Sequence, residues 1–189
     1  MNDRINNSNV YNWQNITWIF FHKLALNQDT SKNNYYEKFF NSFKTIIPCG
    51  ICRNHYIHML NESKFNLKKN INKQNLFNFT IDIHNNVNKN LGGSSWNYHK
   101  SRVHYNSFFF NIGNFEKFIS IYVFHNFKKG PEKTQKLFQM LLCFAHIFPR
   151  YKIREKLIEY VDKLKPNIQN FNSWLSTYLF IIRNTNKIK

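Results

Sequence analysis

The chain has 189 residues, enough for one domain with its own hydrophobic core and a sizeable addition. It contains 20 Phe, 10 Tyr and 4 Trp but only 5 Gly and 4 Pro. So few turn-forming residues argue against a β-sandwich or β-barrel, which need frequent tight turns, and favour a helical protein.

The net charge is +17 at neutral pH, and the basic residues are spread over both halves of the chain. Such charge suits polyanionic partners, including nucleic acid, anionic membranes and acidic proteins, without choosing among them. Residues 1–15 lack the order of basic and apolar segments found in a secretory signal. No apolar run approaches the roughly 20 residues that cross a bilayer. We therefore expect a soluble protein with no membrane span.

Apolar residues in the first half recur at spacings of three and four, which predicts helices over 13–25 and 35–47. Pro48 ends the second of these, because proline disfavours a helical residue before it and suits the first turn of the next helix. The pair Cys49 and Cys52 therefore opens a third predicted helix.

A polar stretch, residues 61–73, precedes a fourth predicted helix over 76–91, which stops at the glycines 92 and 93. Residues 94–106 are predicted to form a short connector. About four further amphipathic helices are predicted in the second half, at 115–123, 137–147, 153–164 and 168–182. We place a boundary near 105–113, which divides the chain into units at 10–105 and 110–189.

The Cys49–Cys52 pair has three ordinary interpretations: half a zinc site, a redox pair or coincidence. Zinc would need further ligands such as His55, His58 or His84, although the first two share one helix with the cysteines and could not easily complete a tetrahedron. The redox interpretation has a physical basis, because a thiol in the first turn of a helix faces unpaired N–H groups and the positive end of the helix dipole. A thioredoxin fold would require strands around the motif, and no convincing strand is predicted there.

Three segments in order carry a resemblance: TWIFFHKLA at 17–25, PCGICRNHY at 48–56 and DIHNNVN at 82–88. Trp18 and His22 share one helical face in the first segment. Together the segments resemble the Erv/ALR family of FAD-linked sulfhydryl oxidases, particularly its branch in large DNA viruses. The resemblance covers roughly residues 10–100. It implies an all-α fold: a four-helix bundle that binds FAD at its mouth, with an additional C-terminal helical region here.

The resemblance also implies the chemistry. Cys49 would accept electrons from a substrate dithiol, and Cys52 would lie next to the flavin, from which O2 takes the electrons and becomes hydrogen peroxide. The positions corresponding to residues that line FAD in the family are Trp18, His22, His84, Asn85 and Asn88, with Val87 and Leu91 packing the pocket. His55 and Tyr56 match a further family run and either flank the flavin or pack against the second helix.

One departure from the family pattern concerns the part of the cofactor beyond the flavin. The lysine that usually follows the Leu-Gly pair is replaced by Gly93, so Lys89 or Lys100 is expected to neutralise the pyrophosphate. Trp96 is a predicted aromatic lid on the adenine.

A second cysteine pair, which relays electrons in many family members, has no counterpart, since Cys143 is alone and predicted to be an inert buried thiol. We therefore expect direct reaction with a protein dithiol, such as a thioredoxin-like relay protein. Residues 110–189 are expected to serve dimerisation, giving a homodimer, or partner docking. The expected location is the cytoplasm, at a viral assembly site or in the virion. The competing interpretation is a basic helical nucleic-acid-binding module with a structural zinc site.

Overall fold

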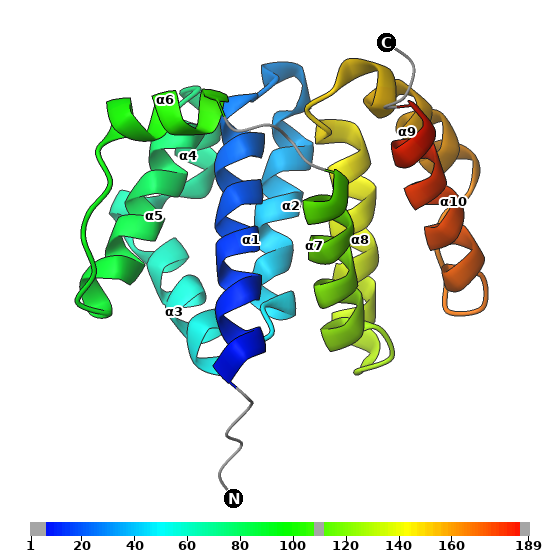
Figure 1. Ribbon diagram of the computed structural model, residues 1–189, viewed down its shortest axis with the longest axis horizontal. Coiled ribbons are helices and arrows are strands. Elements are labelled where there is room, and N and C mark those ends of the chain that lie inside the picture. The colour runs from blue at the N-terminus through cyan, green and yellow to red at the C-terminus, as the bar shows by residue number, and fades with distance from the viewer. Residues whose placement is uncertain (1–6, 108–111, 186–189) are drawn as a thin grey trace, which may run out of the picture.

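The computed structural model describes residues 7–107 and 112–185, and all regular secondary structure in these ranges is helical (Figure 1). The long helices are α1 (Asn7–Leu26), α2 (Asn33–Ile46), α3 (Gly50–Asn61), α5 (Leu76–Asn90), α7 (Ile112–Asn126), α8 (Pro131–Ile147), α9 (Tyr151–Lys163) and α10 (Phe171–Thr185), and the shorter ones are η1 (Thr30–Lys32), η2 (Ser63–Phe65), α4 (Leu67–Asn72) and α6 (Tyr98–Ser107). Helices α1 and α2 stand in the middle, with α3, α5 and α6 on one side and α7 to α10 on the other (Figure 1). The predicted all-α fold with extra C-terminal helices is confirmed.

Helices begin or end at proline and glycine residues, including the predicted signals at Pro48 and at glycines 92 and 93. Helix α2 ends two residues before Pro48, and α8 begins at Pro131, where the missing N–H costs nothing. Beyond the end of α5, Gly92 takes a left-handed φ of 72°. The Gly93 N–H then donates to the carbonyl of Asn88 at 2.7 Å, which satisfies one of the last carbonyls of the helix.

The polar stretch and the predicted connector both contain short helices that were not predicted. The polar stretch 61–73 holds η2 and α4, whose Leu67 and Ile71 are buried. The predicted connector 94–106 holds most of α6, which Asn97 caps by accepting backbone N–H groups of His99 and Lys100. Each of these helices buries too few side chains for a helical period to be visible in the sequence.

One hydrophobic core runs through the molecule from α1 to α10. The ring of Phe20 on α1 lies 4.6 Å from that of Phe118 on α7 and 6.2 Å from that of Phe144 on α8, measured between centroids. Polar contacts cross the same region: the hydroxyl of Thr17 pairs with that of Tyr122 at 2.9 Å. The predicted units at 10–105 and 110–189 thus share packed side chains, and the division into two domains stays a prediction.

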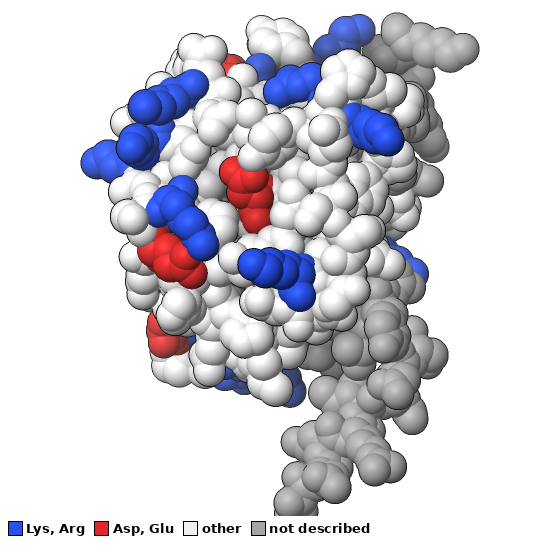
Figure 2. Space-filling model, turned by 90° about the vertical axis from the view of Figure 1, so that its left-hand side faces the viewer, with Lys and Arg blue, Asp and Glu red and all other residues white. Residues whose placement is uncertain are grey.

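Charged side chains are scattered over the surface. On the face formed by the α3 and α5 side of the molecule, more Lys and Arg than Asp and Glu side chains are visible, and some of the basic side chains lie close together at one edge (Figure 2). Among the residues that the structure describes, no helix has the length and apolar character to cross a membrane.

Candidate redox site at the Cys49–Cys52 disulfide

The two cysteines form a disulfide at the start of α3, with their Cα atoms 5.2 Å apart. Cys49 is the N-cap of the helix, and its sulfur accepts the backbone N–H of Cys52 at 3.2 Å. The Arg53 guanidinium donates to the Ile47 carbonyl at 2.9 Å and so fixes the junction between α2 and α3. The predicted placement of the pair at a helix start is confirmed, and both sulfurs lie where a helix N-terminus favours negative charge.

A cavity of about 270 Å³ lies between α1, α3 and α5 and reaches the disulfide. Cys52 forms part of its wall, whereas Cys49 does not. The predicted site residues in the wall are Trp18, Cys52, His55, Tyr56, His84, Val87, Asn88 and Leu91, while His22, Asn85, Lys89, Trp96 and Lys100 are not among the wall residues. The three segments singled out in the sequence therefore converge on one hollow next to the sulfur pair.

Aromatic rings stack along one side of this cavity. The indole of Trp18 lies parallel to the His84 imidazole, with 4.3 Å between centroids and 6° between planes. Trp96 continues the stack beyond His84 at 5.9 Å. Flat rings in this arrangement form a wall suited to another flat aromatic system.

Behind that wall a chain of hydrogen bonds fixes the protonation of two histidines. Thr80 donates its hydroxyl to the Phe77 carbonyl, so it accepts from Nδ1–H of His22 at 2.9 Å. Nε2 of His22 then accepts from Nδ1–H of His84 at 3.0 Å. Nε2 of neutral His84 is left without a proton, which gives the cavity wall a ring with an acceptor nitrogen.

Burial keeps both imidazoles uncharged. His22 is fully buried, and desolvation, followed by repulsion from His84 and His104, holds its pKa well below the usual value. Desolvation also lowers the pKa of His84, to about 4. The pair is therefore neutral at physiological pH.

Acidification is expected to destabilise the protein through this pair. The unfolded chain takes up protons near pH 6.5, whereas folded His84 does so only near its lowered pKa of about 4. Stability is therefore fully present above pH 6.5 and falls as the pH drops toward 4, by up to about 3 kcal/mol from His84 alone. Urea denaturation followed by helical circular dichroism at several pH values in this range measures the loss.

The His84→Gln variant should lose less stability over this range than the parent, and His58→Gln, at an exposed position, is the matched control. An unfolding free energy that falls equally in parent and His84→Gln would contradict the assignment.

Asn85 and Asn88 hold the chain that follows α5. Asn85 donates to the Trp96 carbonyl at 2.9 Å and accepts the Trp96 N–H at 2.6 Å. Asn88 donates to the carbonyl of Ser94 at 3.0 Å and also contributes to the cavity wall. These amides thus position Trp96 against the aromatic stack, and a direct contact of Asn85 with a cofactor stays a prediction.

Lys89 and Lys100 are exposed, near the end of α5 and the start of α6. Neither lysine lines the cavity. Their predicted role, neutralising the pyrophosphate, remains a prediction.

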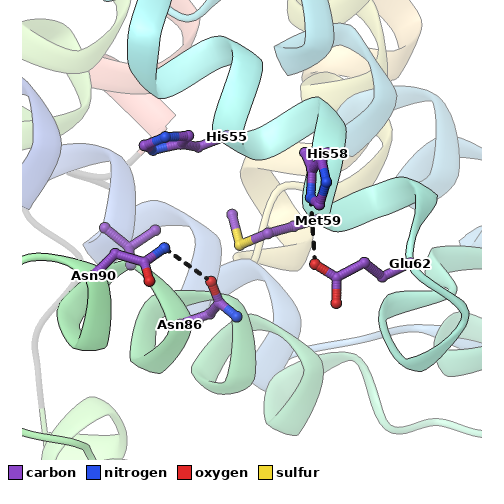
Figure 3. A pocket seen from close by; sticks show the side chains of 7 residues that line it. His55, His58, Met59, Glu62, Asn86 and Asn90 are labelled. Carbon is purple, nitrogen blue, oxygen red and sulfur yellow. Dashed lines mark hydrogen bonds and ion pairs between the residues drawn. The ribbon is translucent and has the colours of Figure 1, made fainter.

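A second hollow of about 240 Å³ adjoins the first between α3 and α5 (Figure 3). Its wall consists of His55, His58, Met59, Glu62, Asn86, Val87 and Asn90, of which His55, Met59, Val87 and Asn90 also line the first cavity. His58 pairs with Glu62 at 3.4 Å, and Asn90 donates to Asn86 at 3.4 Å. The shared residues make this hollow a polar extension of the first.

The state of the cysteines argues against metal binding and against a reactive third thiol. Because the sulfurs of Cys49 and Cys52 are bonded to each other, neither is available as a zinc thiolate in this state. Within residues 7–107 and 112–185, no group of three or more His, Cys, Asp or Glu side chains is arranged to hold a metal ion. Cys143 is free and buried, and burial raises the pKa of its thiol to about 12.

Sequence reasoning missed several residues of the site, and two residues that it missed make polar contacts with predicted site residues. Gln14 donates to the Cys52 sulfur at 3.8 Å, and Thr80 orients His22. Each lies four residues before a predicted site residue, Trp18 or His84, and so shares its helical face. That spacing could have identified both.

Comparisons with known proteins find relatives for the part of the chain that builds this cavity. The model of the Erv1 / Alr family matches residues 15–106, from α1 into α6. A probable FAD-linked sulfhydryl oxidase of Acanthamoeba polyphaga mimivirus is 38% identical over 85 residues, which are 42% of this chain and 59% of the relative. The chain thus covers little more than half the length of that relative, and no solved structure gives a significant match. Residues 15–106 of the chain are therefore similar to the Erv1/Alr family, both in the family model and in this viral relative.

Proposed function

We propose that the chain is an FAD-dependent sulfhydryl oxidase that forms disulfides in protein substrates. The observation that carries the proposal is the cavity next to the Cys49–Cys52 disulfide, whose wall holds Cys52 together with the stacked Trp18 and His84. When bound, FAD accepts an electron pair from the reduced cysteines and passes it to O2, giving hydrogen peroxide.

The residues present fit this cofactor. The cavity, at about 270 Å³, is near the lower limit of common ligand pockets, about 300–1,000 Å³, and is mainly apolar with a few polar groups. This suits a planar ring system more than a whole dinucleotide, so the ring would enter the cavity and the rest would extend outside. Trp18 and His84 would stack on flat parts of the cofactor, and Asn88 would supply a hydrogen-bonding amide.

The two sulfurs have different surroundings, which supports different roles. Cys52 lies in the cavity wall and would face the flavin, whereas Cys49 lies outside the wall and would face the substrate. A substrate thiolate would attack the Cys49 sulfur, form a mixed disulfide there and release Cys52 as a thiolate with the electron pair of the broken bond. The second substrate thiol would then displace Cys49, which leaves a substrate disulfide and a reduced cysteine pair.

The expected substrate is a protein dithiol, with a thioredoxin-like relay protein as one candidate. Support comes from the cysteine count, because Cys143 is buried and cannot form a relay pair with itself. A homodimer through the helices after residue 110, and work at a viral assembly site in the cytoplasm, are the accompanying proposals from the family resemblance.

Purified protein is expected to carry a flavin spectrum and to consume O2 when supplied with a dithiol, producing one hydrogen peroxide per disulfide. Trp18→Ala should weaken FAD binding at least about tenfold, since it removes the stacking ring. Flavin content after dialysis and FAD titration of the stripped protein measure this.

Phe124→Ala, which changes an exposed aromatic residue on α7, is the control and should keep full FAD affinity. A colourless protein that neither binds added FAD nor takes up O2 with dithiols would overturn the proposed function.

A further inference from the structure

We propose that Gln14 acts on the reacting sulfur of Cys52, by stabilising it as the thiolate that leaves when the Cys49–Cys52 bond is broken. The inference rests on the proposed oxidase function and assigns a further catalytic residue to it. Gln14 lies on α1, and its side-chain amide donates to the Cys52 sulfur on α3 at 3.8 Å, within the range of hydrogen bonds to sulfur.

The position of Gln14 is set by the same helical face that builds the cavity. Gln14, Trp18 and His22 follow one another at intervals of four residues, so their side chains project from one side of α1. Gln14 and Cys52 are both partly buried and both belong to the cavity wall. The amide therefore reaches the sulfur inside the site, where water competes less for the hydrogen bond than at the open surface.

Among the described residues, each of the two sulfurs accepts one N–H group, and the two donors differ. The Cys49 sulfur accepts the backbone N–H of Cys52 at 3.2 Å, as part of the helix cap. The Cys52 sulfur accepts the side chain of Gln14. The nearby cation, Arg53, directs its guanidinium to the Ile47 carbonyl instead. Stabilisation of Cys52 can therefore be altered by mutation without touching the backbone that stabilises Cys49.

The hydrogen bond would strengthen during the reaction. When a substrate thiolate attacks the Cys49 sulfur, a bond forms between these two sulfurs, the Cys49–Cys52 bond breaks, and Cys52 keeps its electron pair. A disulfide sulfur is a weak acceptor, while a thiolate carries a full negative charge and accepts strongly. An interaction that grows as charge develops favours the transition state over the ground state and speeds bond breakage.

The test measures Cys52 directly in the full-length chain carrying Cys49→Ser. The rate of alkylation by iodoacetamide is followed against pH at the peptide that contains Cys52, with and without Gln14→Leu. In Gln14→Leu, loss of the amide donor should raise the midpoint of this pH profile, which reports the ionisation of the Cys52 thiol, by about one pH unit. Below the midpoint, the thiolate fraction of Cys52 then falls about tenfold. Gln14→Glu has the same length but places a negative charge there, so it should raise the midpoint at least as far.

Asn54→Leu, at an exposed position on α3, is the matched control and should leave the midpoint unchanged. A second measurement keeps both cysteines: in glutathione buffers without oxygen, Gln14→Leu should shift the equilibrium toward the Cys49–Cys52 disulfide about tenfold. Unchanged Cys52 midpoints in Gln14→Leu and Gln14→Glu, with an unchanged glutathione equilibrium, would overturn the inference. If Gln14→Leu fails to fold, Gln14→Glu alone decides by the same two measurements.

Neither measurement depends on O2 uptake, so the two proposals can fail separately. A parent protein that consumes no O2 but shows the Gln14-dependent midpoint overturns the oxidase and leaves the interaction with Cys52 in place. An active oxidase whose Cys52 midpoint ignores Gln14 overturns this inference alone.

Discussion

Replacing Cys52 with alanine is expected to lower dithiol-dependent O2 consumption by at least about a thousandfold, the range seen when a residue that makes and breaks covalent bonds is removed. The remaining Cys49 can still attack or be attacked by a substrate sulfur, but no neighbouring thiol can resolve the mixed disulfide. Cys52→Ala should therefore accumulate a covalent complex with its substrate through Cys49. An oxygen electrode measures the first effect, and non-reducing electrophoresis with mass spectrometry measures the second.

Cys143→Ala is the matched control for this experiment, because it removes a cysteine whose buried, protonated thiol lies outside the cavity wall. Cys143→Ala should consume O2 at the rate of the parent and should form no covalent complex with the substrate. Recovery of complexes linked only through Cys143 would refute the assigned roles of Cys49 and Cys52.

Phe118→Ala is expected to reduce the free energy of unfolding by about 3–5 kcal/mol, the usual cost of emptying a large buried aromatic site. Phe118 is fully buried, and its ring meets those of Phe20 from α1, Phe43 from α2 and Tyr122 on its own helix. The space left by the ring would open between the helices of residues 15–106 and the helices that follow them. Urea titration followed by circular dichroism measures the loss.

The same titration tests the predicted division at residues 105–113. If the shared core joins both parts, parent and Phe118→Ala each unfold in one transition, and the whole curve shifts to lower urea. Two transitions, of which only the later helices move, would instead support independent domains. Phe180→Ala, at an exposed site on α10, is the control and should change stability by less than about 0.5 kcal/mol.

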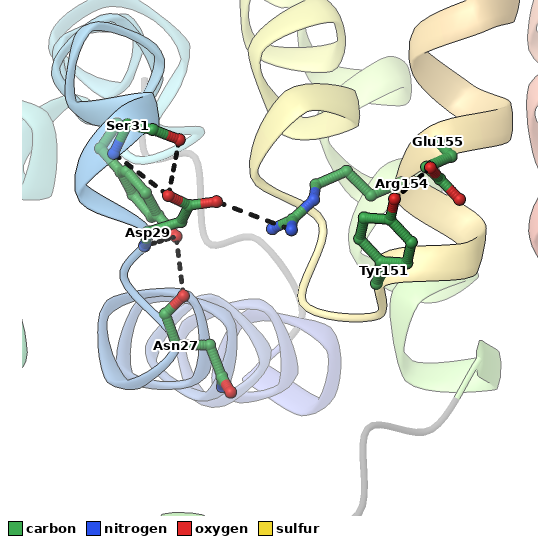
Figure 4. A network of polar contacts seen from close by, with 7 residues as sticks. Asn27, Asp29, Ser31, Tyr151, Arg154 and Glu155 are labelled. Atoms are coloured by element: carbon green, nitrogen blue, oxygen red, sulfur yellow. Dashed lines mark hydrogen bonds and ion pairs between the residues drawn. The ribbon is translucent and has the colours of Figure 1, made fainter.

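A polar connection at the surface adds to the joint between the two parts. Arg154 of α9 pairs with Asp29 at 3.6 Å, and Asp29 also accepts from the side chain of Ser31 at 2.7 Å (Figure 4). The hydroxyl of Tyr36 donates to the Asn27 carbonyl at 3.1 Å beside this network. These contacts fix the loop between α1 and α2 against a helix from the other half. Their partial exposure makes them worth about 1 kcal/mol or less, well below the contribution of Phe118.

The features that could be predicted from the sequence are those set by local spacing. Pro48 placed the cysteine pair at a helix start, and intervals of four residues placed Trp18 and His22 on one face of the first predicted helix and His84 and Asn88 on one face of the fourth. Contacts between helices could not be predicted in this way. The bonds of Gln14 to Cys52 and of His22 to His84 depend on how far one helix slides along another, which no local pattern encodes.

The short helices could not be predicted for a different reason. Helix α6 is stabilised by a cap at Asn97 and by the burial of Tyr105, whose carbonyl also accepts the ammonium of Lys23 at 2.6 Å. One cap and one or two buried residues give no periodic signal, so the segment was predicted to be a connector.

Because Cys143 is buried, the redox state of the cysteine pair can be followed by titrating the accessible thiols. With one sulfhydryl enclosed by the core, every thiol that a gentle reagent can titrate on the folded, reduced protein belongs to the 49–52 couple. Counting accessible sulfhydryls then reports directly how many reducing equivalents the Cys49–Cys52 pair holds. The Cys143 thiol reacts only when the hydrophobic core opens, so its reaction with the same reagent also reports unfolding.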